Sequence, residues 1–284
     1  MRSEKEVMAL IETFIQKDER IRVATLEGSR TNPNAIKDAF QDYDVSFFVT
    51  DLDSYEKDDR WLSAFGNVVF LQKPERMTLF PPDFPGWMSY LTYFDDGVRI
   101  DITLIPLHEI QQYVADCDGL MRVLIDKDGW VTEKIVATDE QYWIQKPTPE
   151  MLKDSCNEFW HVASYVVKEI YRDDYFFAVD HFNEVLRQEL LRLISWSIGF
   201  KYGFNFSLGK HYKHIKQYIT DEEYEALLQT LAMHHMEALI VSYEKCCELF
   251  ERYTKIIAHH LNMPHPTDGA RMRKFLSEYA KQRN

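Results

Sequence analysis

The stretch LEGSRTNPNAIKDAFQDYDVSFFV, residues 26–49, places a Gly-Ser turn before two aspartates at the mouth of an apolar strand. Carboxylates are poor strand residues, and burying them without a partner is unfavourable. Side chains alternate along a strand, so Asp42 and Asp44 share one face while Tyr43 and Val45 occupy the other. Two carboxylates in this position indicate a bound cation, and we expect a metal ion.

A third carboxylate, Asp101, occupies another apolar strand, VRIDITLIP at residues 98–106. Alternation places Ile100 and Ile102 on one face of that strand and Asp101 on the other. Three carboxylates on neighbouring strands repel one another without a cation, and Mg²⁺ accepts such oxygen ligands together with substrate phosphates. The set therefore predicts a magnesium site for a nucleoside triphosphate.

The Gly28-Ser29 turn follows the predicted strand IRVATLE. Glycine permits close backbone approach, and free N–H groups with the Ser29 hydroxyl can hold phosphate oxygens, to which Arg30 would add charge. A Gly-Ser dipeptide alone is an ordinary turn, and an Asp-x-Asp pair alone is commonly a solvated strand end. The order of turn, paired aspartates and third aspartate favours a nucleotide site.

The bulk composition narrows the function further. The chain has 284 residues and a net charge of -13, which disfavours a general nucleic-acid binder and would attract a cationic substrate. No segment approaches the roughly 20 apolar residues of a membrane helix, and the N-terminus lacks the core of a signal peptide. The four cysteines have no CxxC spacing. We expect a cytoplasmic protein with reduced thiols, acting as a monomer, with no nucleic-acid or membrane partner.

Periodicity divides the chain into two halves. Short β-rich runs between residues 21 and 144, with a tight Asp-Gly hairpin at 95–97, predict a mixed sheet. The linker QKPTPE follows, with Thr148 as a helix cap and Pro149 at the first helical position, and the remaining sequence has helical stripes. We expect an α+β protein, with an N-terminal mixed β-sheet domain at 1–145 and a C-terminal all-helical bundle domain at 146–284.

At these residues the sequence resembles the nucleotidyltransferase superfamily of the DNA polymerase β type, whose turn and acidic positions match Gly28, Ser29, Asp42, Asp44 and Asp101. Over nearly the whole chain it looks more specifically like bacterial aminoglycoside 6-adenylyltransferases. That resemblance implies an enzyme that uses Mg-ATP to adenylylate streptomycin, a small cation, at its 6-hydroxyl and releases pyrophosphate. It also implies an antibiotic-resistance function.

The resemblance also implies roles for the site residues. Asp42 and Asp44 would ligate Mg²⁺ on the ATP phosphates, and Ser29 with neighbouring amides would hold phosphate oxygens. Asp101 would be a third metal ligand or the general base for the attacking hydroxyl, and the sequence leaves both open.

The helical half is expected to supply the remaining contacts. Lys210 and Lys213, in SLGKHYKHIKQYI, would share a helical face and hold ATP phosphates, unless they form a solvated basic face. Asp180 and Glu184 would receive the guanidinium groups of streptomycin, although Arg187 is an alternative partner for Glu184.

Two alternative functions remain open from the sequence. One is a nucleotidyltransferase that acts on another aminoglycoside, or on a protein or tRNA acceptor. The other is a non-catalytic nucleotide-binding protein of the same fold, although all three acidic positions are present.

Overall fold

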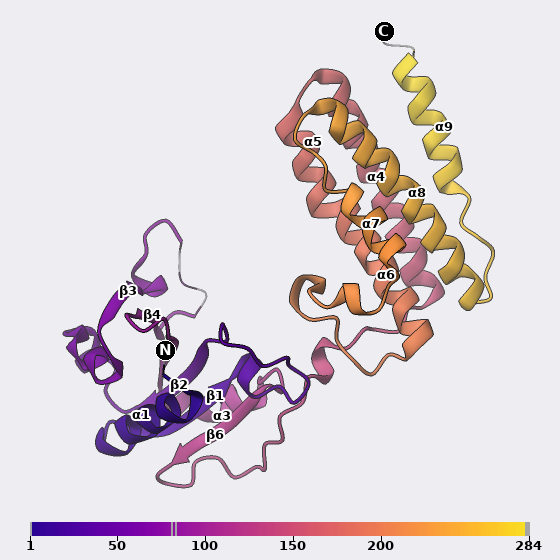
Figure 1. The fold of residues 1–284 in the computed structure, drawn as a ribbon. Helices are drawn as coiled ribbons and strands as arrows, with labels where there is room; N and C mark the ends of the chain where they lie inside the picture. Colours follow the sequence, from indigo (N-terminus) through magenta and orange to yellow (C-terminus); the bar gives the residue numbers. More distant parts are fainter. Residues whose placement is uncertain (1, 81, 83, 282–284) are drawn as a thin grey trace. The chain divides into compact units, whose positions relative to one another are not determined.

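The computed structural model describes residues 2–80, 82 and 84–281, and the chain divides into two compact units, Met1–Gln141 and Tyr142–Asn284 (Figure 1). The first unit carries the sheet and the second is mainly helical. The predicted α+β class is therefore confirmed. The expected first domain, ending at residue 145, extends slightly past the end of the first unit.

The first unit is built on a six-stranded mixed sheet with strand order β3-β4-β5-β2-β1-β6. Strands β2 and β5 are parallel, and the other neighbouring pairs are antiparallel. Asp95 to Gly97 form the predicted hairpin between β4 and β5, with Gly97 at a φ of 83°. The strands are β1 (Ile21–Glu27), β2 (Tyr43–Val49), β3 (Val68–Gln72), β4 (Met88–Phe94), β5 (Arg99–Pro106) and β6 (Met121–Asp126).

Both faces of this sheet are covered. The amphipathic helix α1 (Glu4–Lys17) packs Val7 and Ile11 with Phe47 in the larger core. On the opposite face, helix α3 (Ile110–Ala115) packs Ile110 against Phe48 in a small core. Alternate residues of β2 therefore enter different cores. A short helix, α2 (Asp53–Glu56), follows β2, and the 3-10 turns are Gly28–Arg30, Asp59–Phe65, Pro74–Arg76, Leu107–Glu109 and Glu140–Tyr142.

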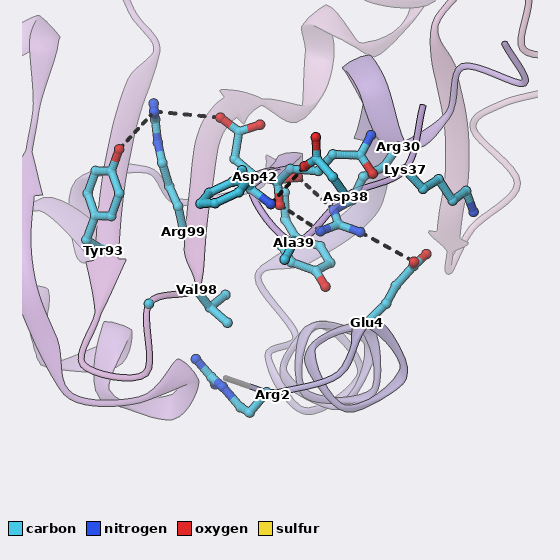
Figure 2. Close-up of a pocket in the computed structure, with 14 residues that line it drawn as sticks. Arg2, Glu4, Arg30, Lys37, Asp38, Ala39, Asp42, Tyr93, Val98 and Arg99 are labelled. Carbon is cyan, nitrogen blue, oxygen red and sulfur yellow. Dashed lines mark hydrogen bonds and ion pairs between the residues drawn. The ribbon is translucent and has the colours of Figure 1, made fainter. Parts of the chain in front are cut away.

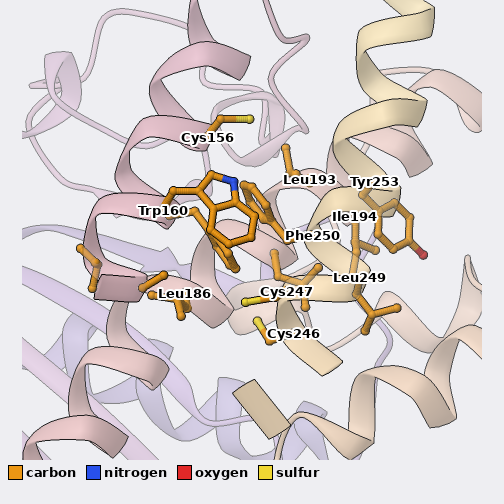
Figure 3. Close-up of a cluster of buried hydrophobic side chains, with 14 of the residues drawn as sticks. Cys156, Trp160, Leu186, Leu193, Ile194, Cys246, Cys247, Leu249, Phe250 and Tyr253 are labelled. Carbon is orange, nitrogen blue, oxygen red and sulfur yellow. The ribbon is translucent and has the colours of Figure 1, made fainter. Parts of the chain in front are cut away.

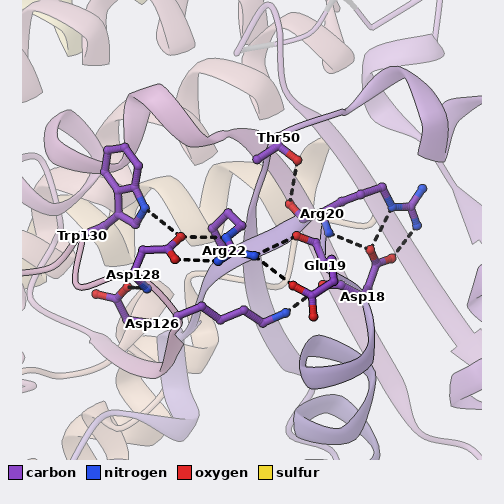
Figure 4. A network of polar contacts seen from close by, with 9 residues as sticks. Asp18, Glu19, Arg20, Arg22, Thr50, Asp126, Asp128 and Trp130 are labelled. Carbon is purple, nitrogen blue, oxygen red and sulfur yellow. Dashed lines mark hydrogen bonds and ion pairs between the residues drawn. The ribbon is translucent and has the colours of Figure 1, made fainter.

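A polar network fixes the end of the sheet where β1 begins (Figure 4). Arg22 donates to both oxygens of Asp128 at 2.7 and 2.6 Å and to Glu19 at 3.1 Å. Asp128 follows β6, whereas Glu19 lies between α1 and β1. The guanidinium thus ties the turn after β6 to the entry of the neighbouring strand.

The second unit consists of helices around one apolar core. Thr148 caps α4 by accepting from Met151 N, and Pro149 opens the helix, as predicted. Trp160 and Phe250 pack in this core, where Cys246 and Cys247 are free and buried (Figure 3). The helices are α4 (Pro149–Arg172), α5 (Tyr175–His181), α6 (Arg187–Tyr202), α7 (Asp221–Gln229), α8 (Met236–His260) and α9 (Asp268–Lys281), with a π-helical turn at Phe182–Leu186 between α5 and α6.

One helical prediction is wrong. The segment SLGKHYKHIKQYI forms two short 3-10 turns, Lys210–Tyr212 and Ile215–Gln217, in place of a longer helix. His211 and Tyr212 adopt left-handed conformations with φ of 55° and 59°, which interrupt helical hydrogen bonding. The contacts of Tyr212 and Ile215 with the core stabilise this path over the local helical preference.

Among the described residues, no helix combines the length and the apolar character needed to cross a bilayer.

Candidate active site

Strand order and direction bring the predicted acidic residues together at one end of the sheet. Asp44 on β2 is paired in register with Asp101 on β5, because the two strands are adjacent and parallel. On the other side of β2, the antiparallel strand β1 places Glu27 opposite Asp44. The turn that begins at Gly28 therefore starts beside the aspartates.

Asp42, Asp44 and Asp101 form the predicted acidic cluster. One carboxylate oxygen from each lies within 4.8 Å of the other two, a grouping able to hold a metal ion. Burial, followed by the charges of Asp42 and Asp101, raises the pKa of Asp44 to about 6. Since a bound cation would relieve this repulsion, and three carboxylate oxygens suit a hard divalent ion, the residues fit Mg²⁺.

Gly28 allows close contact between the turn and the cluster. Its φ is 67°, and a Cβ atom built there would lie 2.6 Å from Asp44 Oδ2. Its N–H donates to Leu120 O at 2.9 Å, while the side chain of Gln41 donates to Ser29 Oγ at 3.2 Å. The turn thus lies directly against the aspartates, with the Ser29 hydroxyl beside it.

A fourth carboxyl group, Glu27, was missed from the sequence. It accepts hydrogen bonds from Thr25 Oγ1 and, at 3.1 Å, from Tyr113 Oη, which also contacts Ser46 at 3.0 Å. Burial is the main cause that raises the pKa of Glu27 to about 7, and Asp44 adds to the shift. The available signal was a carboxylate at the end of IRVATLE, immediately before the Gly-Ser turn.

Arg99 is the second residue that sequence reasoning missed. Its guanidinium donates to both oxygens of Asp101, at 2.9 and 2.5 Å, and lies 3.6 Å from Asp42 Oδ2. It also donates to Tyr93 Oη at 3.3 Å. The signal was its position two residues before Asp101, which places both side chains on one face of β5.

Arg30 makes a different set of contacts from the one expected. Its guanidinium donates to the carbonyl oxygens of Asp42 and Gln41, both at 2.7 Å, and lies 3.6 Å from the ring centroid of Tyr43. An ion pair of 3.4 Å joins it to Glu4. These contacts support the backbone that carries Asp42, and phosphate binding by Arg30 stays a prediction.

A cavity of about 430 Å³ opens beside Asp42 (Figure 2). Four cationic side chains contribute to its lining, from the N-terminus, the 30–42 segment and β5: Arg2, Arg30, Lys37 and Arg99. Asp42 and Arg99 therefore border both the acidic cluster and a cation-rich cavity in the first unit.

The remaining predicted site residues belong to the second unit. Lys210 and Lys213 are exposed. Lys210 begins the first 3-10 turn and Lys213 follows its end, so the expected shared helical face does not exist. Asp180 and Glu184 are also exposed, and the π-helical turn begins between them. No ion pair within the described part of the chain joins Glu184 to Arg187. Ligand contacts of these four residues stay predictions.

Comparison with known proteins identifies clear relatives. Residues 1–279 match the family described as Streptomycin adenylyltransferase. The chain is 47% identical over 276 residues to aminoglycoside 6-adenylyltransferase of Staphylococcus aureus, covering 97% of this chain and 98% of that protein. The protein of the same name from Campylobacter jejuni is 46% identical over 282 residues, covering 99% and 97%.

A solved structure described as an aminoglycoside 6-adenyltransferase from Bacillus subtilis is also similar. It has 40% sequence identity, covers 98% of both chains, and superposes with a TM-score of 0.49.

Proposed function

Because the chain belongs to the streptomycin adenylyltransferase family, we propose that it transfers AMP from Mg-ATP to the 6-hydroxyl of streptomycin and releases pyrophosphate. Relatives named aminoglycoside 6-adenylyltransferase match nearly its full length, so it is an enzyme of the nucleotidyltransferase class. Transfer to an aminoglycoside would inactivate the antibiotic.

The convergence of Asp42, Asp44 and Asp101 is the observation that carries this proposal. Their oxygens lie within 4.8 Å of one another, and the Gly28 turn lies against Asp44. Such a set suits a divalent ion held beside a polyphosphate. When bound, Mg²⁺ would offset the charge of the phosphates and stabilise the pyrophosphate leaving group.

The chain's own residues then have separate roles. Asp42, Asp44 and Asp101 would hold the ion, and Ser29 with the turn amides would orient phosphate oxygens. The drug hydroxyl oxygen forms a bond to the α-phosphorus as the bond to the bridging oxygen of pyrophosphate breaks, and the hydroxyl proton leaves to a base or to solvent. Asp101 is assigned as a ligand because its oxygen belongs to the convergent set.

The helical unit would contribute substrate contacts. Asp180 and Glu184 offer exposed carboxylates for the guanidinium groups of streptomycin, which charge-assisted hydrogen bonds would hold. Lys210 and Lys213 offer exposed ammonium groups for ATP phosphates.

The test is pyrophosphate release by the purified protein with ATP, Mg²⁺ and streptomycin. We expect release that requires all three, with one AMP added to the drug by mass spectrometry. Asp42→Asn should abolish it, whereas Asp154→Asn, which changes an exposed residue of α4, should not. Turnover with other aminoglycosides but not with streptomycin would refute the substrate assignment, and activity of Asp42→Asn would refute the site.

A further inference from the structure

Arg99 holds the oxygens that a metal ion would need. Its guanidinium is bidentate on Asp101 and lies 3.6 Å from Asp42 (Figure 2 shows the contact with Asp42). Asp101 and Asp42 are two of the three members of the acidic cluster. A carboxylate that is forked onto a guanidinium has one lone pair of each oxygen committed to that pair. An ion that binds the remaining lone pairs of Asp101 and Asp42 would lie close to the positive charge of the guanidinium, so the two cations compete for these carboxylates.

Building on the proposed metal site, we propose that Arg99 competes with the divalent ion for Asp101 and Asp42 and, once displaced, binds a phosphate group of the nucleotide. The metal-free cluster keeps one cation among its carboxylates in this way. Loading exchanges that guanidinium for the ion, and the displaced guanidinium remains beside the cluster because β5 holds its backbone.

The surroundings of Arg99 favour a second, anionic partner. Arg99 lines the cavity beside Asp42. Two other guanidinium groups of that cavity have carboxylate partners outside the cluster, since Arg2 pairs with Asp96 at 2.7 Å and Arg30 with Glu4 at 3.4 Å. By contrast, both carboxylates paired with Arg99 belong to the cluster. Metal binding would therefore free the charge of Arg99 more than that of the other two.

The two exchanges are thermodynamically coupled. If the ion takes the carboxylates, the guanidinium becomes available to phosphate, and if phosphate takes the guanidinium, the carboxylates become available to the ion. Linkage requires each ligand to strengthen the binding of the other by the same factor. A bidentate planar group is suited to this role because it matches both carboxylate and phosphate.

The test measures Mn²⁺ binding to the full-length protein without nucleotide, from the electron paramagnetic resonance signal of free Mn²⁺. Removal of the competitor in Arg99→Gln should tighten binding at least about fivefold, since the carboxylates no longer have to release a guanidinium. Arg99→Lys keeps the positive charge but loses the bidentate contact with Asp101, so its Mn²⁺ affinity should lie between those of the wild type and Arg99→Gln. It also serves if Arg99→Gln does not fold.

A matched control is Arg22→Gln. Arg22 is likewise bidentate on a carboxylate and its side chain is 22% exposed, against 32% for Arg99, but it belongs to the network of Figure 4. Its substitution should leave Mn²⁺ affinity unchanged. Asp42→Asn shows that the ion binds at the acidic cluster, because it should weaken Mn²⁺ binding both in the wild type and when combined with each arginine substitution.

A second readout is the affinity for α,β-methylene ATP at saturating Mn²⁺, by calorimetry. We expect Arg99→Gln to weaken it at least about tenfold, because the displaced guanidinium no longer meets a phosphate. Tighter Mn²⁺ binding together with weaker nucleotide binding by Arg99→Gln would support the proposal. Loss of a residue that only held the fold together would weaken the binding of both ligands.

Equal or weaker Mn²⁺ binding by Arg99→Gln would overturn the proposal, as would unchanged nucleotide affinity, or, if only Arg99→Lys folds, wild-type Mn²⁺ affinity in that variant. Failure of the proposed function would look different: without AMP transfer to streptomycin, the opposite changes in Mn²⁺ and nucleotide affinity would still be measured. If the wild type binds no Mn²⁺ through Asp42, the metal site itself is refuted, and the Arg99 proposal with it.

Discussion

At the scale of single residues, Asp44 links the site to stability. Its folded-state pKa of about 6 lies above the value of a free aspartate, so the folded metal-free protein takes up a proton as the pH falls. The resulting stability is present below the unfolded pKa and is lost as pH rises through about 6. At neutral pH the charged Asp44 therefore destabilises the protein unless a cation is bound.

Asp44→Asn should accordingly stabilise the protein in EDTA at pH 7.5, by on the order of 1–2 kcal/mol after allowance for solvent screening. The gain should grow as pH rises from about 4 to about 6 and then stay constant, because only the wild type carries the charge. Mg²⁺ should stabilise the wild type and not the variant. Urea unfolding measures both effects.

The exposed Asp154 provides the control for Asp44. Asp154→Asn should leave stability the same in EDTA and in Mg²⁺, since its side chain lies on the surface of α4. Destabilisation by Asp44→Asn in EDTA at pH 7.5 would contradict the electrostatic account.

Asp101→Asn separates the two roles that the sequence allowed. If Asp101 is a metal ligand, as proposed, the variant loses one charged oxygen of the convergent set. It should then bind Mn²⁺ at least about tenfold more weakly and lose turnover as a result. Electron paramagnetic resonance titration and the pyrophosphate assay measure the two effects. Normal metal and nucleotide binding without turnover would instead identify Asp101 as the general base.

At the scale of elements, the turn after β1 matters because of its proximity to Asp44. Gly28→Ala places a methyl group 2.6 Å from Asp44 Oδ2 and also strains a backbone with φ of 67°. We expect a loss of about 1 kcal/mol of stability from the strain and, in addition, at least a tenfold lower kcat/KM because the carboxylate must move.

Gly129 separates the effect of backbone strain from the effect of contact with Asp44. It has a similar φ of 73°, but a methyl group there would meet nothing within 4 Å. Gly129→Ala should lose comparable stability in thermal unfolding and keep full kcat/KM. Equal activity of the two variants would show that the contact with Asp44 has no catalytic consequence.

The junction of α5 with the π-helical turn is the element proposed to meet the drug. Asp180 is exposed at this junction, and removal of its charge should raise KM for streptomycin by about fivefold to tenfold while KM for ATP stays the same. Steady-state kinetics with each substrate varied in turn measures this, with Asp154→Asn as the control. A parallel rise in both KM values would argue against a drug contact.

At the scale of the whole molecule, the two units have separate cores. The large helical core contains residues from Ile144 onward, and both cores around the sheet end before it. Because the sheet, its two covering helices and the acidic cluster all belong to Met1–Gln141, a fragment of these residues should fold alone and bind Mn²⁺ through Asp42. Circular dichroism and Mn²⁺ titration test this, and an unfolded fragment would show that the sheet unit depends on the helical one.

The sequence by itself determined the features that depend on neighbours along the chain. Short β-rich runs between residues 21 and 144 predicted the mixed sheet, and the shared face of Asp42 and Asp44 follows from the period of two along a strand. The Thr148-Pro149 cap is equally local, since one side chain satisfies an amide three residues away. The acidic motif resembles the nucleotidyltransferase superfamily, and the resemblance over nearly the whole chain predicted the family that the comparison shows.

Only the tertiary structure decided the register of strands far apart in the sequence. Asp44 lies between Glu27 and Asp101 because β2 is antiparallel to one neighbour and parallel to the other, and no local pattern specifies that pairing. The position of Arg99 against two carboxylates is a consequence of the same register. In the helical unit, core packing around Tyr212 replaced the expected helix. Periodicity and capping act over a few residues, whereas the surroundings of a buried charge depend on contacts between distant segments.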